Sequence, residues 1–278
     1  MIDILLATYN GERYLSEQID SILNQSYQNW RLLIRDDGST DKTISIIEQY
    51  CTTFPQQIIK INGPSHNIGV ISSFELLLKE SESDYIMFCD QDDVWLKDKI
   101  KISFETLLKK ETTYGKTIPL LIHTDLMVVD ECLKLINPSF WDYTHLNPNI
   151  IELNKYFLAI ANCITGCTIL MNKAAKNISI PFPDTCLMHD AHIGLKVITN
   201  GYILHLSEPT IYYRQHSKNK LGAIKYIPLR KKIGHLCDII KTNKVRYRAA
   251  HPFIFRSIGH YLYQKIKYSL IIHNQIKL

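Results

Sequence analysis

The chain has 278 residues with a net charge of +5, and 46% of them are hydrophobic, so it can bury one large core or one core with an appended segment. No apolar stretch approaches the ~18 residues of a membrane span, and the sequence begins with a strand pattern, so we expect neither a transmembrane helix nor a signal peptide. The seven cysteines are scattered without a Cys-x-x-Cys pair, which is typical of reduced thiols in a cytoplasmic protein.

Strand and helix patterns alternate along the first part of the chain. Strands are predicted near 2–7, 30–35, 57–62 and 84–89, and helices near 12–24, 41–51, 70–80 and 96–110. Such alternation predicts an α/β fold, with a Rossmann-like, mostly parallel sheet flanked by helices on both faces. In sheets of this kind, ligands bind at the carboxyl ends of the strands.

Polar motifs follow the first two predicted strands. The first strand ends in Thr8-Tyr9-Asn10-Gly11, where Tyr9 offers a stacking face for a base. The second ends in Asp36-Asp37-Gly38-Ser39, and a carboxylate here can accept a hydrogen bond from a base imide or a ribose hydroxyl. A capped turn, in which these carboxylates serve only the local backbone, is an equally good interpretation of the second motif.

Three carboxylates follow the strand near 84–89, in Asp90-Gln91-Asp92-Asp93. Carboxylates crowded at a strand end repel one another unless a cation lies between them, and Mn²⁺ or Mg²⁺ is the usual partner beside a phosphate. We predict Asp92 as the direct metal ligand and Asp90 as a neighbour of the ribose or of the metal's waters. Asp93 is a weaker candidate for either role. The alternative is a solvated acidic turn that begins the next helix.

The second half of the catalytic region is less regular. Residues 120–125 and Cys167–Met171 are predicted strands, residues 162–166 a loop, and residues 138–149 an irregular insertion over an acceptor. His189-Asp190 opens a helical stretch. Because residues three apart share a helix face, His189 and His192 also permit a helical His/Asp metal cluster.

Taken in order, these motifs resemble the nucleotide-sugar half of family 2 glycosyltransferases with the A-type fold. His189-Asp190 matches the place of that family's catalytic base. Tyr213-Arg214-Gln215-His216 resembles a Tyr-Arg-x-His segment of bacterial members that build O-antigens and other polysaccharides, many of them rhamnosyltransferases. The resemblance covers about the first 220 residues. Ala191-His192 departs from the aromatic residues that often follow His-Asp, which leaves the acceptor open.

The resemblance implies an inverting transfer of a sugar from a UDP- or dTDP-linked donor to a glycan hydroxyl. L-Rhamnose is one candidate for this sugar. It implies Asp190 as the general base and His216 as a metal ligand beside Asp92, with His189 and Arg214 as weaker site candidates. Two other classes stay open: a non-catalytic protein that binds sugar nucleotides or glycans, and a nucleotidyltransferase. The latter should carry a Gly-rich, basic loop after the first strand, and Thr8-Tyr9-Asn10-Gly11 is not such a loop.

The carboxyl-terminal region differs in charge from the rest. We expect a catalytic domain over 1–222, with a nucleotide-sugar half 1–110 and an acceptor half 111–222, followed by a basic helical tail 223–278. Residues 218–278 carry 14 Lys and Arg against one acid, whereas the rest of the chain carries −8. Interleaved apolar residues predict amphipathic helices in this tail. These helices either bind an anionic membrane surface, where a lipid-linked acceptor lies, or pack on the catalytic domain. The tail contains no zinc-finger or recognition-helix motif, so we expect no nucleic-acid partner.

Overall fold

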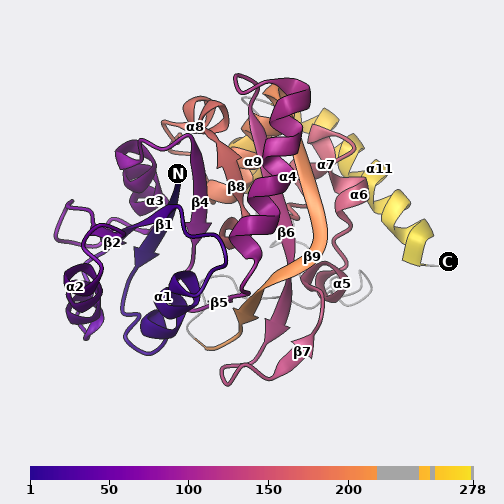
Figure 1. The fold of residues 1–278 in the computed structure, drawn as a ribbon. Helices are drawn as coiled ribbons and strands as arrows, with labels where there is room; N and C mark the ends of the chain where they lie inside the picture. The colour runs from indigo at the N-terminus through magenta and orange to yellow at the C-terminus, as the bar shows by residue number, and fades with distance from the viewer. Residues whose placement is uncertain (218–243, 251–253, 277–278) are drawn as a thin grey trace.

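A single mixed sheet forms the centre of the protein. The computed structural model describes residues 1–217, 244–250 and 254–276. Its sheet has nine strands in the order β3-β2-β1-β4-β8-β6-β9-β5, with β7 attached to β6. Helices cover both faces of the sheet (Figure 1). The predicted α/β architecture is confirmed.

The strands of the amino-terminal half are parallel and are joined by helices. Their bounds are β1 Ile2–Thr8, α1 Leu15–Leu23, β2 Trp30–Asp36, α2 Thr43–Thr53, β3 Ile58–Lys60, α3 Val70–Glu80 and β4 Tyr85–Cys89. β1 pairs in parallel with β2 on one side and with β4 on the other, so their carboxyl ends lie at one edge of the sheet. All strands and helices predicted here are present, with ends that differ by a few residues.

The carboxyl-terminal half extends the sheet with mixed pairing. Its elements are β5 Val94–Trp95, α4 Lys99–Tyr114, β6 Leu120–Val129, β7 Leu135–Asn137, α5 Phe140–Thr144, α6 Pro148–Ile151, α7 Lys155–Ile160, η1 Gly166–Thr168, β8 Leu170–Asn172, α8 Lys173–Ser179, α9 His189–Asn200, β9 Tyr202–Arg214 and α11 Ile258–Ile276. β8 is antiparallel to β4 and β6, whereas β9 is parallel to β6. The short β5 pairs with β9, Val94 opposite Tyr212, and so joins the segment after β4 to the end of β9.

Two predictions for this half are corrected by the structure. Residues 167–171 do not form one strand, because η1 occupies Gly166–Thr168 and β8 begins only at Leu170. The Thr168 hydroxyl donates to the Thr165 carbonyl oxygen at 2.6 Å, a local bond that competes with strand pairing. The insertion 138–149 is also more ordered than predicted. It contains α5 and the start of α6, whose first turns donate backbone N–H groups to the capping side chains of Ser139 and Asn147.

The strand sequences divide their side chains between two hydrophobic clusters. Ile4 and Leu6 of β1 belong to the cluster under α1, α2 and α4, whereas Leu5 between them belongs to the cluster under α3 and α9. This division follows from the two-residue period of a strand. Each fully buried Leu or Ile contributes roughly 1.5–3 kcal/mol, so burial on both faces fixes the register of β1 and the position of its carboxyl end.

The described part of the tail packs with one face on the catalytic domain. Residues 244–250 are helical, and Ala250, Phe255 and Tyr261 are buried in the cluster under α3 and α9. A row four residues apart on α11 faces outward, namely Ile258, Leu262, Ile266 and Leu270, each 46–62% exposed. No helix among the described residues combines the length and the apolar character of a membrane span. The predicted tail residues 223–243 lie outside the described residues.

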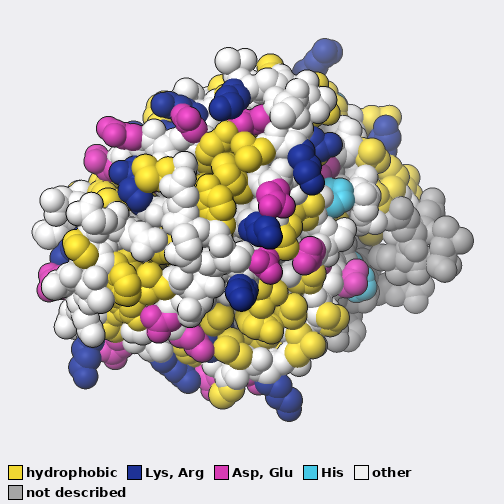
Figure 2. Space-filling model, viewed as in Figure 1, with side chains coloured by type: hydrophobic (Ala, Val, Ile, Leu, Met, Phe, Trp, Pro, Cys, Tyr) yellow, Lys and Arg dark blue, Asp and Glu magenta, His cyan; other side chains and the backbone are white. Residues whose placement is uncertain are grey.

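The charged side chains on one face of the molecule are mixed in sign. On the face shown in Figure 2, Lys and Arg side chains are interspersed with Asp and Glu, and neither sign gathers into one broad patch. Binding of a polyanion such as nucleic acid depends on a continuous basic surface, and this face does not offer one.

Candidate functional site

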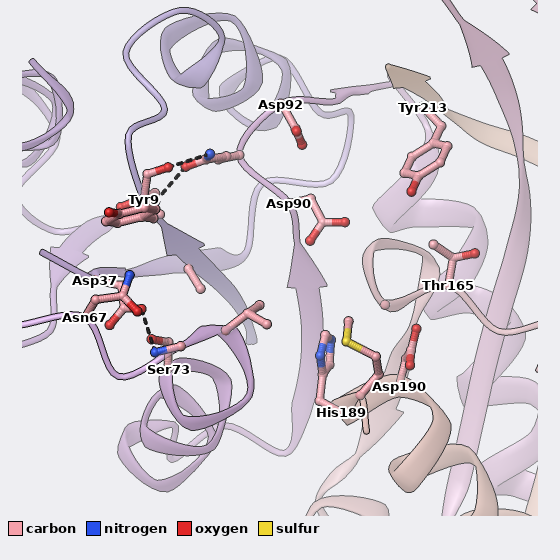
Figure 3. Close-up of a pocket in the computed structure, with 17 residues that line it drawn as sticks. Tyr9, Asp37, Asn67, Ser73, Asp90, Asp92, Thr165, His189, Asp190 and Tyr213 are labelled. Carbon is pink, nitrogen blue, oxygen red and sulfur yellow. Dashed lines mark hydrogen bonds between the residues drawn. The ribbon is translucent and has the colours of Figure 1, made fainter. Parts of the chain in front are cut away.

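A cavity of about 540 Å³ opens at the carboxyl ends of β1, β2 and β4 (Figure 3). The loop before η1 and the first turn of α9 close its other side. Its wall includes Thr8, Tyr9, Asp37, Asn67, Gly69, Ser73, Asp90, Gln91, Asp92, Thr165, Gly166, Met188, His189, Asp190 and Tyr213. This is the edge at which α/β sheets bind ligands, because strand ends and helix starts leave polar groups unpaired there.

The acidic motif after β4 divides its carboxylates between the cavity and the core. Asp90 and Asp92 line the cavity, whereas Asp93 is fully buried and does not. Burial, then the charges of Asp92 and Asp190, raise the pKa of Asp90 to about 7. Burial, then the charges of Asp92 and Asp90, raise the pKa of Asp93 well above its usual value. Each carboxyl group therefore disfavours the ionisation of its neighbours, and a cation in the site would relieve this repulsion.

Asp92 and His216, both predicted metal ligands, lie in contact. His216 Nε2 is 2.8 Å from Asp92 Oδ2, although the two residues are 124 positions apart in the chain. The ring of Tyr14 packs at 5.0 Å from the ring of His216. One carboxylate, one imidazole and the adjacent Asp90 are a donor set that Mn²⁺ accepts, and Mg²⁺ can use the carboxylates.

Arg214 joins the acidic motif to the end of β9 and does not line the cavity. Its Nε donates to the Asp92 carbonyl oxygen at 2.8 Å, and its backbone N–H donates to Asp93 Oδ1 at 3.1 Å. Nη2 pairs with Glu17, and the guanidinium lies over the Tyr14 ring. Arg214 thus positions the backbone of the motif.

A second group of potential metal ligands lies beneath the cavity. One oxygen of Asp90, one of Asp93 and the Cys167 sulfur lie within 4.8 Å of one another. Burial, then Asp93 and Asp90, raise the pKa of the Cys167 thiol well above its usual value. A buried neutral thiol is a poor ligand for hard cations, so Asp92 with His216 fits Mn²⁺ better.

Asp190 stands in the first turn of α9 and points into the cavity that Asp90 enters from the other side (Figure 3). Burial raises the pKa of Asp190 to about 6, and hydrogen bonds from the backbone N–H groups of Ala191 and Gly166 oppose that shift. A buried carboxylate with a pKa near 6 is still mostly ionised at neutral pH and is basic enough to accept a proton from a hydroxyl.

His189 is a buried, neutral neighbour of Asp190. Its ring packs at 4.3 Å from the Phe74 ring and 5.1 Å from the Phe88 ring, and burial lowers its pKa to about 3. Neither ring nitrogen has a hydrogen-bond partner among the described residues. His192 turns the other way, with Nε2 at 3.0 Å from the Ser179 carbonyl oxygen. The described residues therefore form no His189/His192 metal cluster, and that alternative is wrong.

The nucleotide candidates divide into cavity residues and residues that hold loops together. Thr8, Tyr9 and Asp37 line the cavity, and Tyr9 is 47% exposed. Asp36 instead accepts the backbone N–H groups of Gly38 and Ser39, as its capped-turn alternative predicted. Asn10 accepts the Thr40 backbone N–H and has a φ of 48°. Neither Asp36 nor Asn10 reaches the cavity wall; together they pin the first loop to the second.

Asp37 organises the loop before α3. Its Oδ1 accepts the backbone N–H of Ile68 at 2.8 Å and pairs with Arg35 at 3.0 Å, while Oδ2 accepts the Gly69 N–H at 2.8 Å. Gly69 adopts a φ of 86°, a conformation that favours glycine, directly before the first residue of α3. The carboxylate thus fixes the turn that brings Asn67 to the cavity.

Several wall residues were missed by sequence analysis. Gln91 exchanges two hydrogen bonds with the Tyr9 backbone, at 2.9 and 3.1 Å. Its position between the aspartates was a usable signal, because it belongs to the same strand end. Asn67 and Thr165 come from segments without a motif, whereas Tyr213 belongs to the Tyr213-Arg214-Gln215-His216 segment but was not singled out as a site residue. The 162–166 loop was predicted as a loop, but nothing local to it indicates that it faces β4.

Comparison with known proteins identifies the class. Residues 3–179 match the family described as Glycosyl transferase family 2. The match covers more than half of the chain, so the protein belongs to this family of glycosyltransferases. The resemblance seen in the motifs is confirmed, and the nucleotidyltransferase alternative is excluded by the match.

Characterised bacterial proteins are similar over most of their length. The dTDP-rhamnosyl transferase RfbG of Shigella flexneri is 29% identical over 232 residues, covering 78% of this chain and 74% of that protein. The UDP-Glc:alpha-D-GlcNAc-diphosphoundecaprenol beta-1,3-glucosyltransferase WfgD of Escherichia coli is 25% identical over 252 residues, covering 88% and 89%.

Solved structures share the fold. S. aureus TarS in complex with UDP-GlcNAc superposes with a TM-score of 0.60 at 19% identity, over 94% of this chain and 69% of that one. A longer TarS chain is matched over only 36% of its length. The mannosyltransferase PcManGT from Pyrobaculum calidifontis, in complex with GDP-Man and Mn²⁺, gives a TM-score of 0.58 at 16% identity, over 80% and 58%. The A-type glycosyltransferase fold is thus confirmed.

Proposed function

We propose that the protein is a metal-dependent, inverting glycosyltransferase that moves a sugar from a nucleoside diphosphate to a glycan hydroxyl in bacterial polysaccharide synthesis. The observation that carries this proposal is that Asp90, Asp92 and Asp190 line one cavity, the first two after β4 and the third at the start of α9. Sugar transfer needs charge neutralisation at the leaving pyrophosphate and proton removal at the attacking hydroxyl. These carboxylates supply the two functions from opposite walls.

The donor nucleotide lies along β1, β2 and β4 in this proposal. The exposed face of Tyr9 stacks on the base, and Thr8 and Asp37 offer hydrogen-bonding groups beside it. Asp90 faces the ribose or the phosphates. Relatives named for dTDP- and UDP-linked sugars support a donor of this class.

Asp92 and His216 hold the cation, with Asp90 beside them. When bound, Mn²⁺ or Mg²⁺ neutralises the charge that develops on the departing diphosphate. Arg214 keeps the Asp92 backbone in place, and β5 ties the same loop to β9. Both ligands therefore sit on segments that the fold fixes before the donor arrives, which reduces the ordering cost of binding.

Asp190 is the general base. It accepts the proton of the acceptor hydroxyl as that oxygen attacks the anomeric carbon, on the side opposite to the leaving diphosphate. Such in-line displacement inverts the anomeric centre. The neutral ring of His189 and the rings of Phe74 and Phe88 behind it give this carboxylate a dry environment, which favours the raised pKa.

The sugar proposed is L-rhamnose, on the basis of the similarity to RfbG. The acceptor proposed is a lipid-linked glycan at the cytoplasmic face of the membrane, because WfgD is named for a diphosphoundecaprenol acceptor. The exposed apolar row of α11 would let the enzyme bind such a surface reversibly.

The experiment that tests this function is a transfer assay on the purified full-length protein. UDP-, dTDP- and GDP-linked sugars are first screened for thermal stabilisation with Mn²⁺ and with chelator, and each donor that binds is then incubated with lipid-linked acceptors. Free nucleoside diphosphate and glycosylated lipid should appear together, and NMR of the product reports the anomeric configuration. Donor binding without transfer to any acceptor, or a retained configuration, would contradict the proposal.

A further inference from the structure

A second cluster of metal-binding side chains lies away from the cavity just described. His123 Nε2 is 2.5 Å from Glu152 Oε1, and the Cys163 sulfur is 3.8 Å from the same oxygen. All three ligand atoms lie within 4.8 Å of one another. None of the three residues belongs to the wall of the donor cavity.

Strand register brings two imidazoles to this cluster. His123 on β6 and His205 on β9 are partners in a parallel ladder, so their side chains share one face of the sheet. His205 Nδ1 contacts the other Glu152 oxygen at 2.9 Å. The Trp141 ring packs edge-on against both imidazoles, and its Nε1 donates to the Cys163 carbonyl oxygen at 3.1 Å.

The cluster is buried, and hydrogen bonds do not satisfy it completely. His123 is 0% exposed and Cys163 1% exposed, while the Glu152 side chain is 10% exposed. The second ring nitrogen of His123 has no hydrogen-bond partner among the described residues. Burial raises the pKa of Glu152, but the bonds to His123 and His205 outweigh it and lower this pKa to about 2. The two imidazoles thus hold this buried carboxylate in place between them.

We propose that His123, Glu152 and Cys163 bind a divalent transition-metal ion, with Zn²⁺ as the best fit. An imidazole nitrogen, a carboxylate oxygen and a thiolate are a typical zinc donor set, whereas Mg²⁺ and Ca²⁺ avoid sulfur. Ligand atoms around tetrahedral zinc lie about 3.3 to 3.8 Å apart, so small movements of His123 and Glu152 make room for the ion. A water molecule takes the fourth position.

Binding changes the protonation of one ligand and leaves His205 outside the coordination sphere. Burial, then Glu152, raise the pKa of the Cys163 thiol well above its usual value, so the proton leaves for solvent as the Zn–S bond forms. His205 holds the second carboxylate oxygen and orients the ligand, as outer residues of zinc sites do.

The ion would stabilise the wall of the acceptor half. The helices α5, α6 and α7 have five, four and six residues, too short to be stable alone. Glu152 follows α6 and Cys163 follows α7, while His123 belongs to the central sheet. A shared ion would tie this helical segment to β6. Asp125, two residues after His123 on the same strand, accepts the backbone N–H groups of Phe140 and Trp141 at the start of α5.

Metal analysis of the full-length protein tests the proposal. Protein purified without chelator should contain about one equivalent of zinc by mass spectrometry of the metal. After chelation, Co²⁺ should restore the stoichiometry and produce the absorption of a sulfur-to-cobalt charge transfer. Cys163→Ser should abolish that absorption, and His123→Gln should lower the metal content at least tenfold. Cys132→Ser, a change at an exposed thiol, should alter neither.

Three outcomes would overturn the proposal. The first is wild-type protein that contains no zinc and gives no sulfur–cobalt absorption. The second is an absorption that survives Cys163→Ser but disappears in Cys167→Ser, because that places the ion at the group beneath the donor cavity. The third is unchanged zinc in His123→Gln. Because the cobalt spectrum of the wild-type protein is read directly, the test holds even if one variant folds poorly.

Discussion

The two walls of the donor cavity are built in different ways. On the donor wall, Asp37 and Gln91 are already hydrogen-bonded to backbone groups of neighbouring loops, so the shape exists before any ligand binds. On the opposite wall, Asp190 is buried, His189 packs among rings, and the His189 nitrogens have no partner in the described part of the chain. A wall whose polar groups all have hydrogen-bond partners is suited to binding. A wall with buried polar groups, some without hydrogen-bond partners, is suited to proton transfer.

Replacement of Asp190 should produce the largest effect and should separate the two walls. Asp190→Asn keeps the shape but removes the base, so turnover should fall by about 10² to 10⁴ while donor affinity stays nearly unchanged. Steady-state kinetics and calorimetry measure the two quantities. Asp184→Asn, at an exposed position a few residues earlier, is the matched control. Near-normal turnover in Asp190→Asn would show that the base lies elsewhere.

Replacement of Asp92 should change the binding of the donor, in contrast to replacement of Asp190, which should change turnover. Asp92→Asn removes a charge from the contact with His216, so the gain in nucleoside-diphosphate affinity on adding Mn²⁺ should fall by about 10- to 100-fold. Calorimetry with Mn²⁺ and with chelator measures this gain. Asp84→Asn, beside the opposite end of β4 and exposed, is the control. Equal affinity with and without metal in the wild-type protein would refute the metal role.

The pH dependence of turnover should report the protonation of Asp190, on the wall opposite to the donor wall. The base works deprotonated, and burial raises the pKa of Asp190 to about 6. Below that value the protonated fraction dominates, so kcat should fall by about tenfold per pH unit, and above about pH 7 it should be level. Rates measured with saturating donor and Mn²⁺ check this. If the residual activity of Asp190→Asn shows the same fall in kcat at low pH, a group other than Asp190 is responsible for the titration.

The smallest effect is expected at the outer face of the tail, where α11 exposes its apolar row. Leu262→Ser with Ile266→Ser should weaken binding to anionic liposomes several-fold, because buried apolar area contributes to interfacial binding. The same changes at Leu135 and Ile136, which are similarly exposed on β7, serve as the control. Flotation at low and high salt measures binding, since screening shortens from ~10 Å at 0.1 M to ~3 Å at 1 M. Equal binding of both double variants would leave α11 without a membrane role.

Much of the donor wall could be predicted because its information is local. A buried strand, a polar turn and a helix follow one another in a short stretch, and parallel pairing then brings consecutive strand ends to one edge. The distribution of roles within a motif was harder to foresee. Asp93 and Asp36 look like Asp92 and Asp37 in the sequence, but one is buried under the site and the other caps a turn, since neighbouring strand-end residues point in different directions.

The acceptor side depended on contacts between distant segments. The sequence contained Asp190 at the start of a helix and an alternation that specified the α/β class, and periodicity and capping suffice for both. The resemblance of the motifs implied that His216 lies beside Asp92, and the structure shows this contact. Only the tertiary structure could turn His192 away from the cavity and gather His123, Glu152 and Cys163. These contacts depend on how antiparallel β8 and the bent β6–β9 pair close the sheet, and side-chain packing over long sequence separations has no local pattern.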